Sequence, residues 1–411
     1  MSRFRFPAPS RRLVSAALLA ALAAGCTHLP PQEPSAMRDE RQFDRARLAA
    51  LDGVLDNAVA ARKLPGAVLR MEREGAVHER GFGRLSYEPD AAAVTPDTIF
   101  DAASLSKVIS TAPAVLMLAE EGRIDLEAPL LRYFPECKGG GKEAITVRHL
   151  LTHSSGLPAG LPARPGWSGD AAAHELACAQ QVTHAPGTFF RYSDINYILL
   201  GQLVRKVSGM PLDEFAQRRI FGPLRMRDTG YLPLARTGAA AIAPTQKGAA
   251  DAALHGDLAP GQLLRGVVHD PTVRRIGGVA GSAGVFSTAR DIARFARMLL
   301  NSGELDGVRV LSRDSVRLLT TVQSPPGIAA LRGMGMDIDS PYAQRPRGTV
   351  FPVGSYGHTG FTGCILWIDP ASKTFYVFLS NRVYPDDKSN VLTLYTELGT
   401  LAAQAALSTL R

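Results

Sequence analysis

The sequence predicts an α/β fold of the α+β type, in which one antiparallel sheet is flanked by terminal helices and joined to a mostly helical subdomain. Two pairs of short apolar runs separated by turn residues, over 66–85 and 363–381, predict the sheet. Strands near the two ends of a chain most economically join one antiparallel sheet. Helical patterns over 41–62 and 390–410 predict the helices that cover it, and the segment of about 110–285 shows helix and loop patterns only.

The first 25 residues are predicted to be a lipoprotein signal peptide. Arginines precede an apolar run over 13–24, which is too short to span a bilayer comfortably. The letters LAAGC resemble a bacterial lipobox, so Cys26 is the expected lipidation site; an ordinary cleaved signal with a chance cysteine is the alternative. Residues 26–40 are rich in proline and polar side chains and predict a flexible tether, and 41–411 is the expected folded domain.

Composition and charge exclude two classes of protein. With 411 residues and 45% hydrophobic side chains, the chain can bury a large core and is not expected to be disordered. The formal net charge is +8, four arginines leave with the signal peptide, and the remaining basic residues are scattered among acids. No nucleic-acid partner is therefore expected.

After the signal peptide, Cys137, Cys178 and Cys364 remain, so at most one internal disulfide can form. The spacing of the three cysteines does not say which two would pair.

The letters DAASLSK contain a candidate nucleophile. If Asp101 caps a helix, Ser104 and Lys107 share one face and Ser106 points elsewhere. A serine becomes nucleophilic when a neighbouring group takes its proton, so Ser104 is the candidate and Lys107 its partner. The Ser104 N–H, in the first helical turn, is free to stabilise an oxyanion. Pro113 is expected to kink or break this helix.

Two further stretches strengthen the case, FRYSDINYILLG at 190–201 and YGHTGFTG at 356–363. Together with the Ser-x-x-Lys motif, they resemble the three sequence elements of penicillin-recognising serine hydrolases of the class C beta-lactamase type. That family includes D-alanyl-D-alanine carboxypeptidases, D-aminopeptidases and esterases. The resemblance spans about 45–400 and implies a beta-lactamase/transpeptidase-like fold with no cofactor. A general α/β-hydrolase is disfavoured, because the sequence has no Gly-x-Ser-x-Gly motif.

The resemblance also implies roles for individual residues. Ser104 would be acylated, while Lys107 and Tyr192 would manage its proton. The Phe361 N–H would join the Ser104 N–H in an oxyanion hole, and Thr359 would face the substrate. The substrate-binding positions implied in this way are Asp194, His358, Thr359, Gly360 and Phe361.

Two of these positions depart from the family pattern. Asp194 stands where asparagine is usual, and a carboxylate there favours a charged Lys107. We therefore expect an ammonium that lowers the pKa of Tyr192, whose phenolate would be the general base, although the motifs alone leave the choice between Lys107 and Tyr192 open. His358 stands where beta-lactamases of this type carry lysine. Its conditional charge favours a peptidase, amidase or esterase over an efficient beta-lactamase.

The remaining histidines give weaker signals. His149 and His153 have the spacing of a metal pair, but no glutamate or third ligand accompanies them, so no metal site is expected. His269 and Asp270 resemble a segment of carboxypeptidase-like and muropeptide-amidase-like relatives. Ser282 replaces the histidine usual in the accompanying glycine stretch, so we expect this loop to have a packing role.

The expected function is that of an envelope serine hydrolase acting through an acyl-enzyme at Ser104, as a D-alanyl-D-alanine carboxypeptidase-like peptidase on peptidoglycan-derived peptides. An esterase or beta-lactamase, a muropeptide amidase and a catalytically inactive binding lipoprotein are the alternatives, since a fold does not fix a substrate. The expected partners are a small peptide or ester, peptidoglycan fragments, and the membrane through a lipid anchor on the periplasmic side. The oligomeric state is not predicted.

Overall fold

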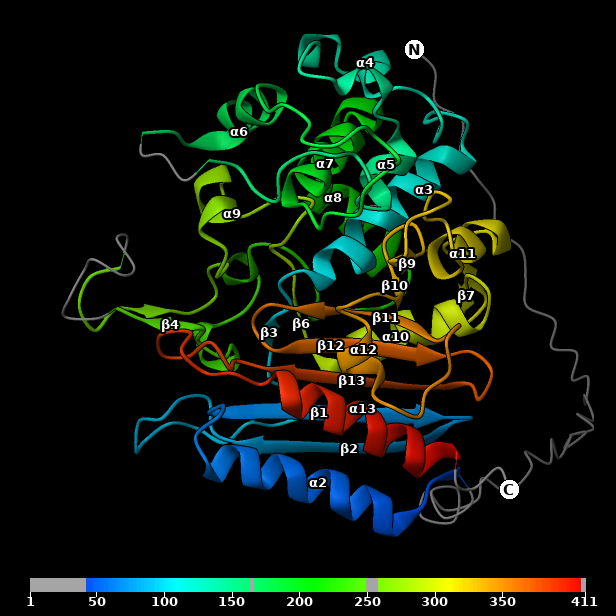
Figure 1. Cartoon of the computed structure of the whole chain (residues 1–411). Coiled ribbons are helices and arrows are strands. Elements are labelled where there is room, and N and C mark those ends of the chain that lie inside the picture. Colours follow the sequence, from blue (N-terminus) through cyan, green and yellow to red (C-terminus); the bar gives the residue numbers. More distant parts are fainter. Residues whose placement is uncertain (1–41, 163–165, 249–257, 408–411) are drawn as a thin grey trace, which may run out of the picture. The chain divides into compact units, whose positions relative to one another are not determined.

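A computed structural model of the chain describes residues 42–162, 166–248 and 258–407 (Figure 1). The predicted signal peptide, the tether and Cys26 lie outside these residues. Within the described part, no helix combines the length and the apolar character needed to cross a membrane.

The predicted antiparallel sheet is confirmed and has seven strands, in the order β2-β1-β13-β12-β11-β10-β9. The strands are β1 (Gly66–Arg73), β2 (Ala76–Gly83), β9 (Leu331–Arg332), β10 (Asp337–Asp339), β11 (Tyr356–Gly360), β12 (Cys364–Asp369) and β13 (Thr374–Ser380). Strands from the two ends of the chain are neighbours in this sheet, because β1 pairs with β13. The sequence analysis missed β9 and β10, and it placed the His-Thr-Gly motif before a strand, whereas this motif lies within β11.

The predicted hairpin over 66–85 is formed by β1 and β2, and the chain turns at Glu74 and Gly75. Glu74 has φ 46° and Gly75 has φ 87°. Two consecutive residues with positive φ match the right-handed twist of the two strands, as in the two-residue turns that hairpins prefer.

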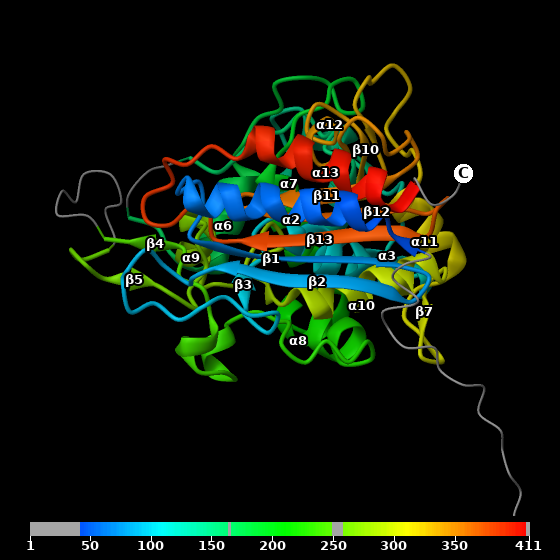
Figure 2. The same cartoon turned by 90° about the horizontal axis from the view of Figure 1, so that it is seen from below.

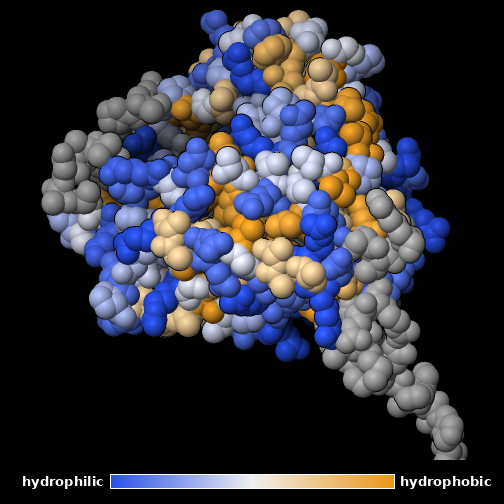
Figure 3. Space-filling view, turned by 60° about the horizontal axis from the view of Figure 1, so that its bottom comes forward, coloured by the Kyte–Doolittle hydropathy of each residue, from blue (hydrophilic) through white to orange (hydrophobic). Residues whose placement is uncertain are grey.

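The two predicted terminal helices, α2 (Arg45–Ala60) and α13 (Leu392–Leu407), pack against each other on one face of the sheet (Figure 2). Helix α10 (Ala289–Leu300) lies on the other face. Side chains alternate between the two faces of a strand, so Val68 enters the core on the α10 side, whereas Leu69 enters the core beneath α2 and α13. On the face drawn in Figure 3, hydrophilic side chains surround smaller hydrophobic patches.

Helices dominate the segment between β3 and β6, two-residue strands that pair with each other. The elements are β3 (Phe100–Asp101), a π-helical turn (Lys107–Thr111), α3 (Ala112–Glu120), α4 (Leu130–Tyr133), α5 (Val147–Leu151), α6 (Gly169–Cys178), α7 (Asp194–Ser208), α8 (Leu212–Ala216), β4 (Gln246–Lys247), β5 (Leu263–Leu264), α9 (Pro271–Ile276) and β6 (Phe286–Ser287). The later part of the chain adds β7 (Glu304–Leu305), β8 (Val308–Arg309), α11 (Arg313–Thr320) and α12 (Gln344–Arg347).

The helix that follows β3 begins differently from the prediction. Asp101 is the last residue of β3 and does not cap the helix; its Oδ1 accepts a hydrogen bond from Ala103 N instead. The chain stays helical through Pro113 and is not broken there, but a π-helical turn interrupts the α-helical pattern just before α3, whose first turn contains the proline. Proline has no N–H to donate, so the start of a helix tolerates it.

Candidate active site

The chain turns sharply at Ser104. Ala103 adopts a left-handed conformation with φ 46°, which a residue with a side chain adopts only when its surroundings hold it there. The Asp101 carboxylate supplies two of these restraints, because it accepts hydrogen bonds from Ala103 N at 2.9 Å and from His269 N at 2.7 Å. The turn presents Ser104 to a cavity of about 610 Å³ that Tyr192 also lines.

Lys107 is fully buried, and its ammonium has three acceptors. Nζ donates to Ser104 Oγ at 3.0 Å and to the Ser282 carbonyl oxygen at 2.8 Å, and it lies 2.7 Å from Asp194 Oδ1. A lysine ammonium has three N–H groups, so each has a partner. Burial opposes the charge, but the Asp194 carboxylate and Tyr192 outweigh it, and the pKa of Lys107 is raised. The predicted ammonium is therefore supported.

The prediction that the pKa of Tyr192 is lowered is wrong. Loss of contact with water raises the pKa of Tyr192; Lys107 lowers it, as predicted, but Asp194 raises it again, and the net direction is upward. Tyr192 is a phenol at rest, and its hydroxyl interacts with both Ser104 and Lys107. A base for the Ser104 proton therefore forms only when the Lys107–Tyr192 pair loses one proton. Because the two groups are coupled, the pKa of this proton loss is a property of the pair and not of either residue.

His153 is a residue of the site that the sequence analysis missed. Its buried ring lies 4.4 Å from the Tyr192 ring, between centroids, and its Nδ1 accepts a hydrogen bond from Ser193 N at 3.1 Å. Burial and the charge of Arg332 hold the pKa of His153 well below its usual range, so the ring is neutral. The neighbouring His149 instead accepts from Thr146 N in a capping box. His149 and His153 therefore have different structural roles.

Strand β11 also lines the cavity, through His358, Thr359 and Gly360. Gly360 is required there, because a Cβ at this position would lie 2.5 Å from the Ala102 carbonyl oxygen. This close approach brings Phe361, which follows β11, to the same cavity as Ser104. Neither the Ser104 N–H nor the Phe361 N–H donates to another described residue. The arrangement is suited to binding an oxyanion, as the sequence predicted.

His358 cannot supply a positive charge in this site. Its Nδ1–H donates to the Thr359 carbonyl oxygen at 2.7 Å, which fixes the tautomer. Burial, followed by the charges of Arg332 and Lys107, holds the pKa of His358 well below its usual range. The conditional charge expected from the sequence is therefore absent at neutral pH, although His358 and Thr359 do line the Ser104 cavity.

The cavity contains three cationic side chains that the sequence analysis did not single out, and one of them lacks a carboxylate partner among the described residues. Arg345, Arg382 and Lys388 all line it. Arg382 pairs with Asp387 at 2.5 Å, and Lys388 pairs with Asp386 at 2.5 Å. No carboxylate of the described residues pairs with the Arg345 guanidinium, which is therefore free to bind an anionic group of a ligand. No sequence signal distinguishes Arg345 from other surface arginines.

The His269 loop has the structural role predicted for it and one contact that was not foreseen. Asp270 caps α9 by accepting from Val273 N at 2.9 Å, and the His269 ring lies 5.7 Å from the Phe361 ring. The glycine stretch around Ser282 also contacts the site. The Ser282 backbone carbonyl oxygen accepts a hydrogen bond from Lys107 Nζ, and this contact does not depend on the histidine that the family usually has at this position.

The fold and this site define a serine hydrolase. The Beta-lactamase family model matches residues 51–399, and the chain belongs to that family. It is 29% identical over 386 residues to a Salmonella agona protein named "Putative D-alanyl-D-alanine carboxypeptidase", covering 86% of each chain. An Escherichia coli protein of the same name is 30% identical over 354 residues, with 80% of this chain and 77% of that protein covered. Among solved structures, the octameric penicillin-binding protein homologue from Pyrococcus abyssi matches with a TM-score of 0.65 and 24% identity, over 86% of this chain and 76% of that one, and shares the fold.

Proposed function

We propose that this serine hydrolase is a D-alanyl-D-alanine carboxypeptidase that acts on peptidoglycan-derived peptides through an acyl-enzyme at Ser104. The names of the two curated relatives agree with this proposal. The observation that carries it is the unpaired Arg345 guanidinium in the Ser104 cavity. A peptide that ends in D-alanyl-D-alanine has a carboxylate next to the scissile bond, and a guanidinium binds a carboxylate with two parallel hydrogen bonds. A neutral ester would leave this group unused.

The proposed reaction follows from the contacts of Ser104. The Lys107–Tyr192 pair, having lost one proton, takes the hydroxyl proton as Ser104 Oγ attacks the carbonyl carbon of the scissile amide. The N–H groups of Ser104 and Phe361 stabilise the oxyanion. The pair returns the proton to the leaving nitrogen, and free D-alanine departs. Water then attacks the ester, and the peptide leaves as a carboxylic acid.

An envelope location is part of the proposal. It rests on the predicted signal peptide and on Cys26, and it suits an enzyme whose substrate lies in the cell wall. Labelling of Cys26 by a radioactive fatty acid in cells, with Cys26→Ser as the control, tests the lipid anchor.

The activity is tested by D-alanine release from an N-acylated L-lysyl-D-alanyl-D-alanine peptide and by turnover of the same peptide with a C-terminal amide. Arg345→Gln is expected to raise KM for the acid by about 10- to 100-fold, since a charge-assisted hydrogen bond is worth about 1.5–3 kcal/mol. The amide peptide should be affected little. Ser104→Ala should abolish both activities.

Three other outcomes would overturn the proposal. Turnover of a neutral ester without any D-alanine release would make the protein an esterase. Rapid consumption of benzylpenicillin in place of peptide cleavage would make it a beta-lactamase. If no peptide, ester or penicillin adds mass at Ser104, the protein is a binding protein with this fold. Equal changes in KM for the acid and the amide in Arg345→Gln would remove Arg345 as the carboxylate contact.

A further inference from the structure

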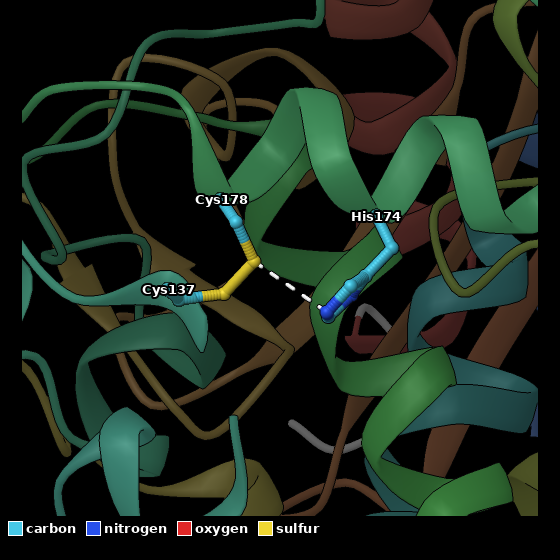
Figure 4. Close-up of side chains that lie close together, drawn as sticks. All are labelled: Cys137, His174 and Cys178. Carbon is cyan, nitrogen blue, oxygen red and sulfur yellow. Dashed lines mark hydrogen bonds between the residues drawn. A yellow bond between two sulfur atoms is a disulfide. The ribbon is translucent and has the colours of Figure 1, made fainter. Parts of the chain in front are cut away.

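A cluster of two cysteines and a histidine lies outside the Ser104 cavity (Figure 4), and the Glu136 carboxylate contacts the histidine. Cys137 ends a short 3₁₀ helix (Pro135–Cys137), and His174 and Cys178 lie four residues apart on α6. Their ligand atoms all lie within 4.8 Å of one another. The two cysteines form a disulfide in this structure, whereas Cys364 is a free thiol buried elsewhere. We propose that, once this disulfide is reduced, Cys137, Cys178, His174 and Glu136 bind one thiophilic divalent cation of the Zn²⁺ class.

The hydrogen bonds of His174 point to a cation at its Nε2. Gln202 Nε2 donates to Asp170 Oδ1 at 3.0 Å, so the amide oxygen of Gln202 faces His174 Nδ1, at 2.8 Å. Nδ1 therefore carries a proton. Nε2 faces Glu136 Oε1 at 2.8 Å and Cys178 Sγ at 3.5 Å. In a neutral ring, the Nε2 lone pair would point at a carboxylate oxygen and repel it. A cation on Nε2, either a proton or a metal ion, removes this repulsion.

The donor set fits zinc. Two thiolates, one imidazole nitrogen and one carboxylate oxygen are four ligands of the kinds that tetrahedral zinc sites use. The hydrogen bond from His174 Nδ1 to Gln202 is the outer contact that orients metal-binding histidines. The Phe134 ring, 4.9 Å from the His174 ring, restrains it from one side. Glu136 is about half exposed and Cys178 is partly exposed, which gives an ion and a reductant access from solvent.

The oxidised and metal-bound states exclude each other, because the disulfide uses the electrons that thiolates would donate to a metal ion. A dithiol reductant supplies two electrons and two protons, breaks the S–S bond and becomes a disulfide itself, which leaves two thiols on the protein. Metal binding then releases these two thiol protons. At a zinc–sulfur distance of about 2.3 Å, tetrahedral geometry places the two sulfur atoms roughly 3.8 Å apart, so both side chains must rotate.

Cobalt is the probe, because tetrahedral Co²⁺ bound to thiolates absorbs visible light strongly. The full chain carrying Cys26→Ser, which leaves only the cysteines of the described part, is reduced with a phosphine and titrated with Co²⁺. We expect thiolate charge-transfer and tetrahedral d–d bands that saturate at one equivalent and disappear when Zn²⁺ is added. The same chain kept oxidised should show none. Circular dichroism of each sample reports folding.

Matched variants decide whether the bands come from this cluster. Cys364→Ser removes a cysteine outside it and should leave the bands unchanged. Cys178→Ser and His174→Asn should each abolish saturation at one equivalent, and Glu136→Gln should weaken Co²⁺ binding at least tenfold. A reduced, folded chain without these bands would overturn the proposal, as would bands that persist in Cys178→Ser. If reduction unfolds the chain, refolding on Co²⁺ addition supports the site, and failure to refold overturns it.

Discussion

Replacing Asp194 by asparagine tests how the Ser104 proton is accepted. The Asp194 carboxylate lies 2.7 Å from Lys107 Nζ, and burial lowers the pKa of Lys107 less than Asp194 and Tyr192 together raise it. Asp194 also adds to the effect of burial in raising the pKa of Tyr192. Asparagine keeps the size and an oxygen acceptor but removes the charge. The pair should then lose its proton at lower pH, so the ascending limb of kcat/KM against pH should move to lower pH.

The expected shift is about one pH unit. An opposite charge at hydrogen-bonding distance moves a pKa by about 1–3 units. The Asp194 side chain is 37% exposed, and water screens part of its field, so we take the lower end of that range. At any fixed pH below the limb, one unit corresponds to about a tenfold gain in kcat/KM, because each unit is a factor of ten in the deprotonated fraction.

The assay is kcat/KM for an activated neutral ester across the pH range in which the protein is folded. A neutral substrate removes the contribution of Arg345 to binding. Asp387→Asn is the matched control, because Asp387 lines the same cavity but pairs with Arg382; its limb should not move. An unchanged limb in Asp194→Asn would refute the reasoning, and an equal shift in both variants would show that Asp194 acts only as one charge among many.

Two further predictions concern the Ser104 turn. Gly360→Ala places a carbon 2.5 Å from the Ala102 carbonyl oxygen and should lower kcat about 100-fold or more, the cost of a misplaced oxyanion donor. Gly53→Ala, whose added carbon meets no atom within 4 Å, is its control, and equal kcat values would contradict the prediction. Burial raises the pKa of Asp101 to about 6, so the contribution of Asp101 to the free energy of unfolding is greatest below about pH 4 and falls by about 3 kcal/mol as the pH rises through 6. Denaturant unfolding of Asp101→Asn should lack this fall, and a fall of the same size would contradict the assignment.

Much of the sheet and both terminal helices could be predicted, because these elements depend on local sequence patterns. The turn at Glu74 and Gly75, the runs that became β12 and β13, and the helical periodicity of α2 and α13 are readable within short windows. The short strands β9 and β10 were missed because they contain two and three residues, too few to show an alternating pattern. Strand β11 was missed because its glycines, which allow close approach to the Ser104 turn, weaken the signal of a strand.

The sequence by itself determined which groups are the candidates for the chemistry, because the three motifs place a hydroxyl, an amine and a phenol at recognisable positions, and the Asp194 carboxylate already indicated a charged lysine. The tertiary structure decided the protonation states and the partners. The pKa of Tyr192 depends on how much water surrounds it and on the charges of Lys107 and Asp194 together. The neutrality of His358, the Ser282 carbonyl contact with Lys107 and the unpaired state of Arg345 depend on side chains brought together from distant parts of the chain, and no local pattern encodes such distances.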